Sequence, residues 1–449
     1  MLSGMRIQIV YILLFVVVNL SFAQSVPGIV IEQIEADRPE LKYEVGNSFF
    51  LVHYDDEQQL PYAESLLEFA DTAYARICTA RGWAVPLSDN ERGGDDRYDI
   101  YIQEISDAYG VTHGEIIDDL DENCPSYIEI MPGLSNSDLK IVVAHEFTHA
   151  CQLSYSYKDG YGQPNGFWFY ENTAVWMADD IYDWQLNYYQ RYFTIGQDPL
   201  HYPYYSIDYF PTGTYLAYGG FIWVKFLTEW QNNDLIIKQI WTRMGQNEGQ
   251  HIFDDLDYVL STNYNTSFME ALRIYAEWRY FTGERDDDNH FEHAANYPTS
   301  VVLRTHSSYP ANNQNFDIQG PGGTSFIRFT GGNDVTRISI NGDDNQTWAG
   351  SVLEVRDITE IGICVKNKAF NINEDGEGSV DAIGRDTYEL IFAPVCVSDK
   401  KTPNNEIYSA EIPNMKAVLF ENKYSDNNIG DELLLDGTIT VNSGDFVAL

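Results

Sequence analysis

Two histidines and a glutamate stand at a spacing that suits metal-assisted hydrolysis, in the run AHEFTH at positions 144–149. On a helix, His145 and His149 lie one turn apart and about 40° apart around the axis, so both imidazoles can reach one Zn²⁺ ion. Glu146 lies about 100° from His145, where its carboxylate can reach a water beside the metal and act as general base. The alternative is a core helix whose two imidazoles hydrogen-bond to neighbouring groups.

The segment that carries this motif is expected to be a buried helix. It opens with SNSD at positions 135–138, residue types that favour a helix N-terminus. Burying two histidines and a glutamate in such a helix is unfavourable unless they have partners, which favours a metal site. The apolar residues that cover nearly every face of this helix are Ile141, Val142, Val143, Ala144, Phe147, Ala150 and Leu153.

Glu171 is the candidate for a third ligand, since a catalytic zinc ion typically takes three protein ligands and leaves a position for water. It lies 22 residues after His149, in a second apolar segment that reads FWFYENTAVWMAD from position 167. That interval leaves room for a loop and a returning helix. The alternative role for Glu171 is that of a first-turn carboxylate, which the helix dipole favours.

Together the two segments resemble the gluzincin metallopeptidases, the thermolysin-like clan, in which H-E-x-x-H is followed by a glutamate on a second helix. The form E-x-x-A-x-W-x-x-D looks most like a group of secreted bacterial metallopeptidases. The resemblance covers roughly residues 45 to 290. It implies that His145, His149 and Glu171 bind Zn²⁺ and that Glu146 is the general base.

The chain departs from this pattern at one position. Thermolysin-type enzymes carry an aspartate four residues after the ligand glutamate, where it orients a ligand histidine, and here that position is Val175. Asp179 and Asp180 lie about two turns further on, and some acceptor beside a ligand histidine is still expected. The metzincin pattern is excluded, because its third histidine would fall at Tyr155.

Tyr218 is the candidate for stabilising an oxyanion. It lies in YLAYGGF, positions 215–221, which resembles the tyrosine-containing helix start that follows the metal site in several gluzincins. A tyrosine hydroxyl there can stabilise the tetrahedral intermediate. Tyr215 and His201 are rivals, and a purely structural role is the alternative. Thirteen aromatic residues among positions 182–218 predict either a cleft wall or a packed helical layer.

Residues 1–23 are expected to be a secretory signal peptide. A positive start is followed by an apolar run at positions 7–20, and Ser21-Phe22-Ala23 provides small residues before a cleavage at Gln24. A retained anchor is the alternative, for which about 14 residues are short. No later segment approaches transmembrane length, so we expect a soluble, exported mature chain, extracellular or periplasmic, without a membrane span.

The chain is strongly acidic, with 68 acidic and 27 basic residues and a net charge of −41. Such a surface repels nucleic acid and anionic membranes. It could also reflect Ca²⁺ sites. Residues 371–376, NINEDG, begin like an EF-type loop, but Ala382 occupies the twelfth position, and a solvated acidic turn is the alternative.

Five cysteines in an exported protein suggest two disulfides and one free thiol. Cys364 and Cys396 share the C-terminal region and form the expected pair. Cys78, Cys124 and Cys151 compete for the other. Cys151 points away from the metal, about 240° around the helix from the first ligand histidine, so a buried free thiol suits it and Cys78 is left with Cys124.

The order of segments predicts an α+β chain. Strands at 48–54, 99–105 and 126–131 and a helix at 62–82 precede the zinc helix, as in the N-terminal subdomain of a gluzincin, where an edge strand pairs with extended peptide substrate. A helical pattern continues to about residue 285. From 299 short alternating runs predict an accessory β-sandwich, so we expect a metallopeptidase domain at 24–298 and a sandwich domain at 299–449.

The sequence therefore predicts a secreted zinc-dependent peptidase that acts on peptide or protein substrates. Two alternatives stay open. One is a catalytically inactive peptidase-like protein whose C-terminal domain binds a glycan or a protein, although an intact Glu146 argues against it. The other is a zinc hydrolase of a non-peptide substrate.

Overall fold

The described part of the chain runs from residue 28 to residue 411. Within it, the computed structural model describes all residues except 34–37, 107, 117–121, 159–165, 183–189, 212–213, 247–250, 315–317, 331–334, 343–345, 357–363, 370, 384–387 and 399–406. The predicted signal peptide, residues 1–23, lies outside the described residues. None of the helices in the described part of the chain combines the length and the hydropathy needed to cross a bilayer.

The chain divides into two units. One comprises Met1–Gly162 and Met177–Tyr188, and the other comprises Gln163–Trp176 and Tyr189–Leu449. Helix α4 (Phe167–Tyr182) contributes to both. The predicted boundary at residue 299 falls inside the second unit.

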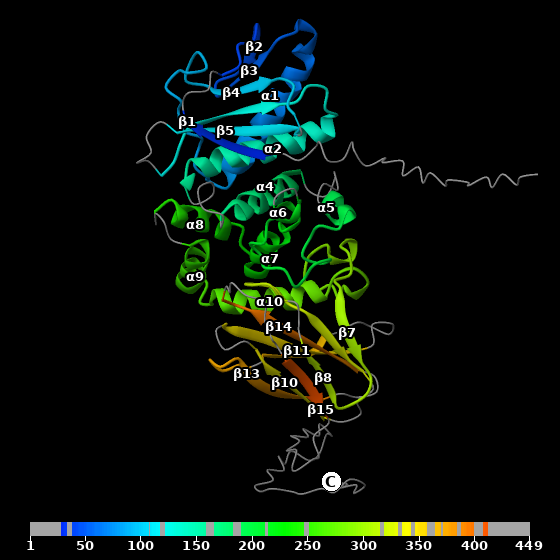
Figure 1. The fold of residues 1–449 in the computed structure, drawn as a ribbon. Coiled ribbons are helices and arrows are strands. Elements are labelled where there is room, and N and C mark those ends of the chain that lie inside the picture. Colours follow the sequence, from blue (N-terminus) through cyan, green and yellow to red (C-terminus); the bar gives the residue numbers. More distant parts are fainter. Residues whose placement is uncertain are drawn as a thin grey trace, which may run out of the picture. The chain divides into compact units, whose positions relative to one another are not determined.

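The first unit is built on a sheet with six described strands, in the order β1-β5-β6-β4-β3-β2 (Figure 1). Strands β1 and β5 are parallel, β5 and β6 antiparallel, β6, β4 and β3 parallel, and β3 and β2 antiparallel. The predicted strands at 48–54, 99–105 and 126–131 correspond to β3, β4 and β6. The strands are β1 (Gly28–Gln33), β2 (Tyr43–Gly46), β3 (Phe50–Tyr54), β4 (Tyr98–Ile102), β5 (Gly110–Ile116) and β6 (Ser126–Ile130).

Strand β5 was not expected, because its glycines and polar residues are typical of a turn. The segment is nevertheless paired on both sides, with β1 and with β6. A strand that finds ladder partners along both edges satisfies its backbone hydrogen bonds whatever its propensity. Strand β5 is therefore not an edge strand, and β1 forms that end of the sheet.

Helices α1 (Leu60–Tyr74) and α2 (Asn136–Leu153) pack against each other and against this sheet, α1 on β3 and α2 on β5 and β6. A proline opens α1, where its missing N–H has no helical partner to lose. Ala63, Leu66, Ala70 and Ala73 recur at helical spacing and are buried. A short 3-10 turn, Glu57–Gln59, precedes α1, and a π-helical turn, Ala75–Ala80, succeeds it.

The helical part of the second unit has a core of large aromatic side chains, in which Trp223 and Phe226 pack on Tyr275. The predicted helical pattern, which continues to about residue 285, corresponds here to helices α5 to α10. The helices are α5 (Gln190–Ile195), α6 (Leu216–Gly219), α7 (Ile222–Gln231), α8 (Leu235–Met244), α9 (Ile252–Asn263) and α10 (Phe268–Tyr280), with 3-10 turns at Gly283–Arg285 and Ala294–Asn296.

Two antiparallel-rich sheets lie further along the same unit, in the described orders β13-β10-β15-β8 and β12-β11-β14-β9-β7. They share a hydrophobic core that includes Ile338, Trp348 and Phe392, and α10 packs on β11 and β14. The chain is thus mixed α+β, as predicted, and the β-sandwich stays our interpretation of this pair of sheets. The strands are β7 (Val302–His306), β8 (Ala311–Gln314), β9 (Phe326–Phe329), β10 (Val335–Asn341), β11 (Trp348–Arg356), β12 (Cys364–Ala369), β13 (Glu377–Ile383), β14 (Tyr388–Cys396) and β15 (Ile407–Glu411).

The cysteines of the first unit are arranged differently from the prediction. Cys78 lies beside Cys151, with the two Sγ atoms 3.6 Å apart, and Cys124 is a separate buried thiol. The side of α2 that carries Cys151 faces the π-helical turn that carries Cys78. Cys78 therefore lies beside Cys151, and not beside Cys124 as the sequence predicted. Burial raises the pKa of Cys124 to about 12, which keeps this thiol protonated.

The expected Cys364–Cys396 disulfide is also absent. Cys396 is a buried thiol outside any disulfide, and its sulfur contacts the carbonyl oxygen of Ser398. Cys364 on β12 pairs with Val355, whereas Cys396 on β14 pairs with Trp348, so the two lie opposite positions of β11 that are seven residues apart (348 to 355). At about 3.3 Å per residue this is roughly 23 Å along the strand, far beyond the reach of a disulfide.

Candidate metal centre and catalytic residues

Helix α2 positions the H-E-x-x-H residues, and its start is fixed by Ser135. The Ser135 side chain accepts a hydrogen bond from the backbone N–H of Asp138 and donates one to the Asp138 carboxylate, 2.6 Å away. Asp138 also places a negative charge in the first turn, where the helix dipole stabilises it. Further along, Phe147 packs edge-to-face on Phe50 and Tyr98, which fixes the rotation of the helix against the sheet.

His145, His149 and Glu171 form a buried cluster in which each side chain offers one ligand atom, and these atoms lie within 4.8 Å of one another. All three residues have no solvent-exposed surface. The Nε2 atoms of His145 and His149 are 3.0 Å apart, with the rings nearly perpendicular. The structure therefore brings together the three residues that the sequence proposed as ligands.

The donor set suits a zinc ion. Two nitrogen atoms that each lie about 2.0–2.1 Å from a tetrahedral zinc ion are about 3.3 Å apart, which is close to the observed distance between the two Nε2 atoms. Two imidazoles and one carboxylate are a recurrent protein ligand set for catalytic zinc. A divalent cation would also offset the charge of the buried carboxylates of Glu146 and Glu171, which is unfavourable in a dry interior.

Gln152 is the group beside a ligand histidine that the sequence did not identify. Its Oε1 atom lies 2.7 Å from Nδ1 of His149, and Gln152 is fully buried. An amide oxygen only accepts hydrogen bonds, so this contact places the proton on Nδ1 and leaves the lone pair of Nε2 for a metal. Asp180, whose place in the sequence made it a candidate for such a role, instead pairs with Arg81.

Glu146 is held by strand β5. The Thr112 hydroxyl lies 2.7 Å from Oε2 of Glu146 and 2.9 Å from its backbone oxygen, and Thr112 is fully buried. Two residues earlier, Gly110 lets the strand approach α2. A Cβ atom at Gly110 would lie 2.7 Å from Cγ1 of Val142 and 2.8 Å from Cγ of Glu146. The close approach of the strand backbone and the Thr112 hydroxyl thus hold the Glu146 carboxylate in place.

The helical turn that carries Glu171 is fixed by aromatic packing within the second unit. Trp241 stacks on Phe169, meets Tyr170 edge-to-face, and places its indole nitrogen 3.3 Å from the Thr173 hydroxyl. Glu171 lies among residues of α4 that are themselves buried on every side. Packing of this kind restricts the side chain to few rotamers, as a metal ligand requires.

Tyr218 lies in a packed group of rings. It is 7% exposed, stacks on Tyr192 at 5.7 Å, and meets Tyr215 edge-to-face. Its helix is joined to the turn of Glu171, because the Asn172 amide donates a hydrogen bond to the Ala217 carbonyl. The oxyanion role of Tyr218 stays a prediction.

His201, a rival for that role, forms a pair with a buried aspartate. Its Nδ1 atom is 2.7 Å from Oδ2 of Asp198, whose Oδ1 accepts the backbone N–H groups of Leu200 and His201. The hydrogen bond that His201 donates to Asp198 raises the pKa of His201. The turn packs closely on α6, since a Cβ at Gly219 would lie 2.1 Å from the carbonyl oxygen of Gln197.

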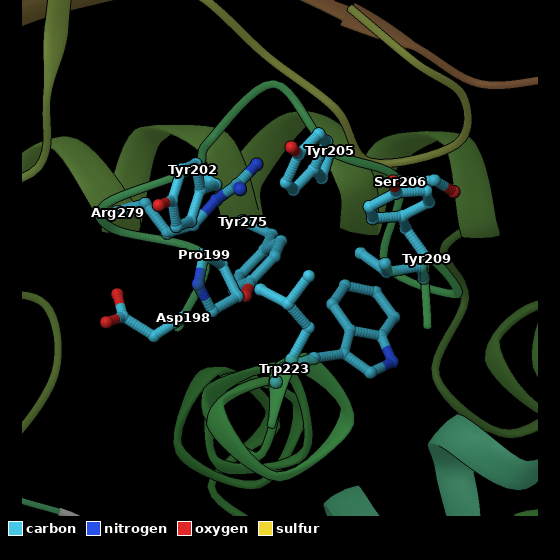
Figure 2. Close-up of a pocket in the computed structure, with 12 residues that line it drawn as sticks. Asp198, Pro199, Tyr202, Tyr205, Ser206, Tyr209, Trp223, Tyr275 and Arg279 are labelled. Carbon is cyan, nitrogen blue, oxygen red and sulfur yellow. The ribbon is translucent and has the colours of Figure 1, made fainter. Parts of the chain in front are cut away.

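Part of the aromatic-rich segment lines a pocket (Figure 2). Its lining residues include Tyr202, Tyr205, Tyr209, Trp223 and Tyr275. Its volume is about 20 Å³, enough for a water molecule and too small for a peptide side chain. The aromatic residues here therefore belong mainly to a packed layer, which was one of the two interpretations of the sequence.

The segment considered for Ca²⁺ forms a turn. The Asn373 carbonyl accepts the backbone N–H of Gly376, and its side-chain oxygen accepts that of Glu377, 2.8 Å away. Gly376 has φ +74°, a conformation that favours glycine. Among the described residues, the only cluster suited to a metal is that of His145, His149 and Glu171.

Comparison with known proteins leaves the family open. No family model matches the chain, and no curated protein matches it. Among solved structures, one similar to this chain is the crystal structure of Legionella pneumophila aminopeptidase A in complex with aspartic acid, with 11% identity and a TM-score of 0.33. The alignment covers 79% of this chain and 36% of that one, so the chain spans about a third of its length. This likeness is too remote to carry an argument about function.

Proposed function

We propose that the protein is a zinc-dependent peptidase with His145, His149 and Glu171 as metal ligands and Glu146 as general base. The observation that carries the proposal is the buried cluster of the three ligands, with the carboxylate of Glu146, on the same helix as the two histidines, held by the Thr112 hydroxyl. Two imidazoles buried only for packing would not account for a second carboxylate held in place by a hydroxyl from another element.

When bound, a zinc ion supplies Lewis acidity, which lowers the pKa of a water molecule and polarises a carbonyl group. Glu146 then accepts a proton from the attacking water and passes it to the leaving amine. Thr112 keeps the carboxylate in the orientation that this transfer needs, because its hydroxyl engages one carboxylate oxygen, Oε2. Gln152 keeps the His149 ring in one orientation and one tautomer.

A donor for the oxyanion completes the proposal. Tyr218 remains our choice, with its hydroxyl as hydrogen-bond donor to the tetrahedral intermediate. His201 is the rival, because Asp198 keeps it protonated to higher pH than a free histidine. We also propose that the chain is exported, with residues 1–23 as a cleaved leader, as the pattern of that segment suggests.

The proposal is tested by metal content and hydrolysis in matched variants. Purified protein should hold one zinc ion per chain and cleave members of a mixed peptide library, and a chelator should abolish cleavage. His145→Ala and Glu171→Ala should lose the metal. Glu146→Gln should retain it and lose hydrolysis by several orders of magnitude.

Two results would contradict the proposal. Undiminished zinc in His145→Ala would exclude the ligand assignment, and full activity in Glu146→Gln would exclude the mechanism. If zinc is bound but the whole peptide library stays intact, a panel of ester and amide substrates separates a hydrolase of another bond from a protein that only binds.

A further inference from the structure

The outer edge of β5 is covered by a strand from near the N-terminus. Strand β1 pairs with β5 in parallel, from Gly28 opposite Val111 to Gln33 opposite Ile116 (Figure 1). It is the last strand on its side of the sheet, and it also lies beside α2. It therefore has one neighbouring strand, whereas β5 has two.

The covered edge belongs to the stretch of strand that holds the general base. Thr112, whose hydroxyl contacts Glu146, is the residue opposite Ile29 of β1. Gly110, whose Cα hydrogen faces the Glu146 side chain, comes directly before the first paired residue, Val111. A chain segment paired with β5 thus runs one strand away from the residues that position Glu146.

An uncovered edge of this kind accepts an extended peptide, because its backbone N–H and C=O groups need partners. Strand β1 shows that this edge accepts an additional strand. The pairing is parallel, which is slightly less stable per residue than antiparallel pairing, and β1 gains no second ladder on its other side. Its departure would therefore break only the ladder with β5 and leave the other strand pairings of the sheet intact.

The chain is anchored independently just after β1. Arg38 donates from Nε to Glu115 on β5, 3.0 Å away, and pairs with Asp99 at 2.6 Å and Asp89 at 2.5 Å. Its guanidinium also lies over the ring of Tyr127, 5.0 Å from the centroid. This buried network holds the chain to the sheet five residues beyond Gln33, so β1 can be lost while the strands from β2 onward stay folded.

We propose that β1 is an intramolecular occupant of the peptide-binding edge of β5, and that an extended peptide substrate pairs with β5 only where β1 has left it. This inference rests on the proposed peptidase function. The chain would then be made with its own substrate edge closed, and displacement or removal of the segment before Arg38 would open it.

The expected size of the effect comes from tethering. A segment held close to its site by a short connection competes at an effective concentration of about 1 mM. A peptide that binds only the open form has its apparent Kd raised by the inverse of the open fraction. If one molecule in ten or fewer is open, releasing β1 should tighten peptide binding about tenfold or more.

The first experiment locks β1 in place in the full mature chain. Gln33→Cys with Ile116→Cys places two cysteines at directly paired positions, four residues along β5 from Thr112. Paired residues of neighbouring strands are about 4.8 Å apart, a distance that a disulfide can span. Oxidation should reduce peptide hydrolysis about tenfold or more, and reduction should restore it. The single variant Gln33→Cys, treated in the same way, is the control.

The second experiment measures binding without hydrolysis, in the Glu146→Gln background. The probe is a fluorescein-labelled synthetic peptide, GIVIEQ on a serine-glycine spacer, whose binding is measured by anisotropy. Val30→Pro and Ile31→Pro form a matched pair. Along an edge strand, the backbone N–H groups of successive residues alternately donate to the neighbouring strand and point away from the sheet. Proline lacks this N–H, so it disrupts pairing only at a residue whose N–H donates to the neighbouring strand. One of the two proline variants should bind the probe about tenfold tighter than the other. The oxidised double variant, Gln33→Cys with Ile116→Cys, should not bind it.

The outcomes separate this inference from the proposed function. The inference would be overturned, whatever the hydrolytic activity, if the probe bound equally to the parent, to both proline variants and to the oxidised double-cysteine variant. It would also be overturned if the oxidised double-cysteine variant hydrolysed peptides at the parental rate. If the binding results are as expected but no variant hydrolyses any peptide, the edge is a strand-binding site and the peptidase proposal fails.

Discussion

The hydroxyl of Thr112 offers the sharpest test of how the general base is positioned. Thr112→Val replaces this hydroxyl by a methyl group of similar size, and it removes the hydrogen bonds to Oε2 and to the backbone oxygen of Glu146 at 2.7 and 2.9 Å. A hydrogen bond to a charged group contributes about 1.5–3 kcal/mol. If that stabilisation orients the carboxylate in the transition state, kcat should fall about ten- to a hundredfold.

The assay separates positioning from folding. Thr112→Val should keep its zinc and change KM little, because its side chain faces Glu146, whereas kcat falls. Thr112→Ser keeps the hydroxyl and should restore most of the rate. The matched control is Thr148→Val on α2, whose hydroxyl is equally buried and bonds only the Ala144 carbonyl, 2.7 Å away. Both valine variants should lose about 1–3 kcal/mol of unfolding free energy. Equal kcat in the two would refute the positioning role.

Three other contacts each make a prediction. Gln152→Leu should weaken zinc binding about 10- to 100-fold in a chelator competition, because the His149 ring loses the acceptor at its Nδ1; unchanged affinity would assign Gln152 a packing role. Tyr218→Phe should lower kcat about a hundredfold or more with little change in KM. If Tyr218→Phe keeps the parental rate and His201→Ala loses it, the oxyanion role belongs to His201. Under a thiol–disulfide oxidant, Cys78 and Cys151 should form the first disulfide found by non-reducing peptide mapping, worth about 2–4 kcal/mol if it closes without strain; two unmodified thiols there would contradict it.

The sequence predicted those parts of the site that depend on spacing within one helix. His145, Glu146 and His149 share α2, so their relative directions are set by the helical repeat alone. Gln152 could have been found in the same way, because it lies three residues after His149 on the same face. Glu171 was reached by the resemblance of its segment to a known pattern, since helical spacing says nothing about a partner on another helix.

The features that were missed depend on contacts between distant segments. Thr112 lies 34 residues before Glu146, and its strand carries glycines that obscure the alternation by which strands are identified. The cysteine arrangement failed for the same reason. Cys78 meets Cys151 because of how a π-helical turn packs on α2, and Cys364 is kept from Cys396 by strand register, neither of which composition reveals.

The close approach of β5 to α2 at Gly110 has a consequence for how such proteins diverge. Any larger residue there would push Cβ to within 2.8 Å of the Glu146 side chain, so the strand would have to move or the carboxylate would have to turn. Among proteins that descend from a common ancestor with this one, those that still hydrolyse their substrate should keep glycine at this position together with H-E-x-x-H. A lineage that retains the motif but carries a branched residue at position 110 should have become a binding protein, and its purified member should hold zinc without turning over.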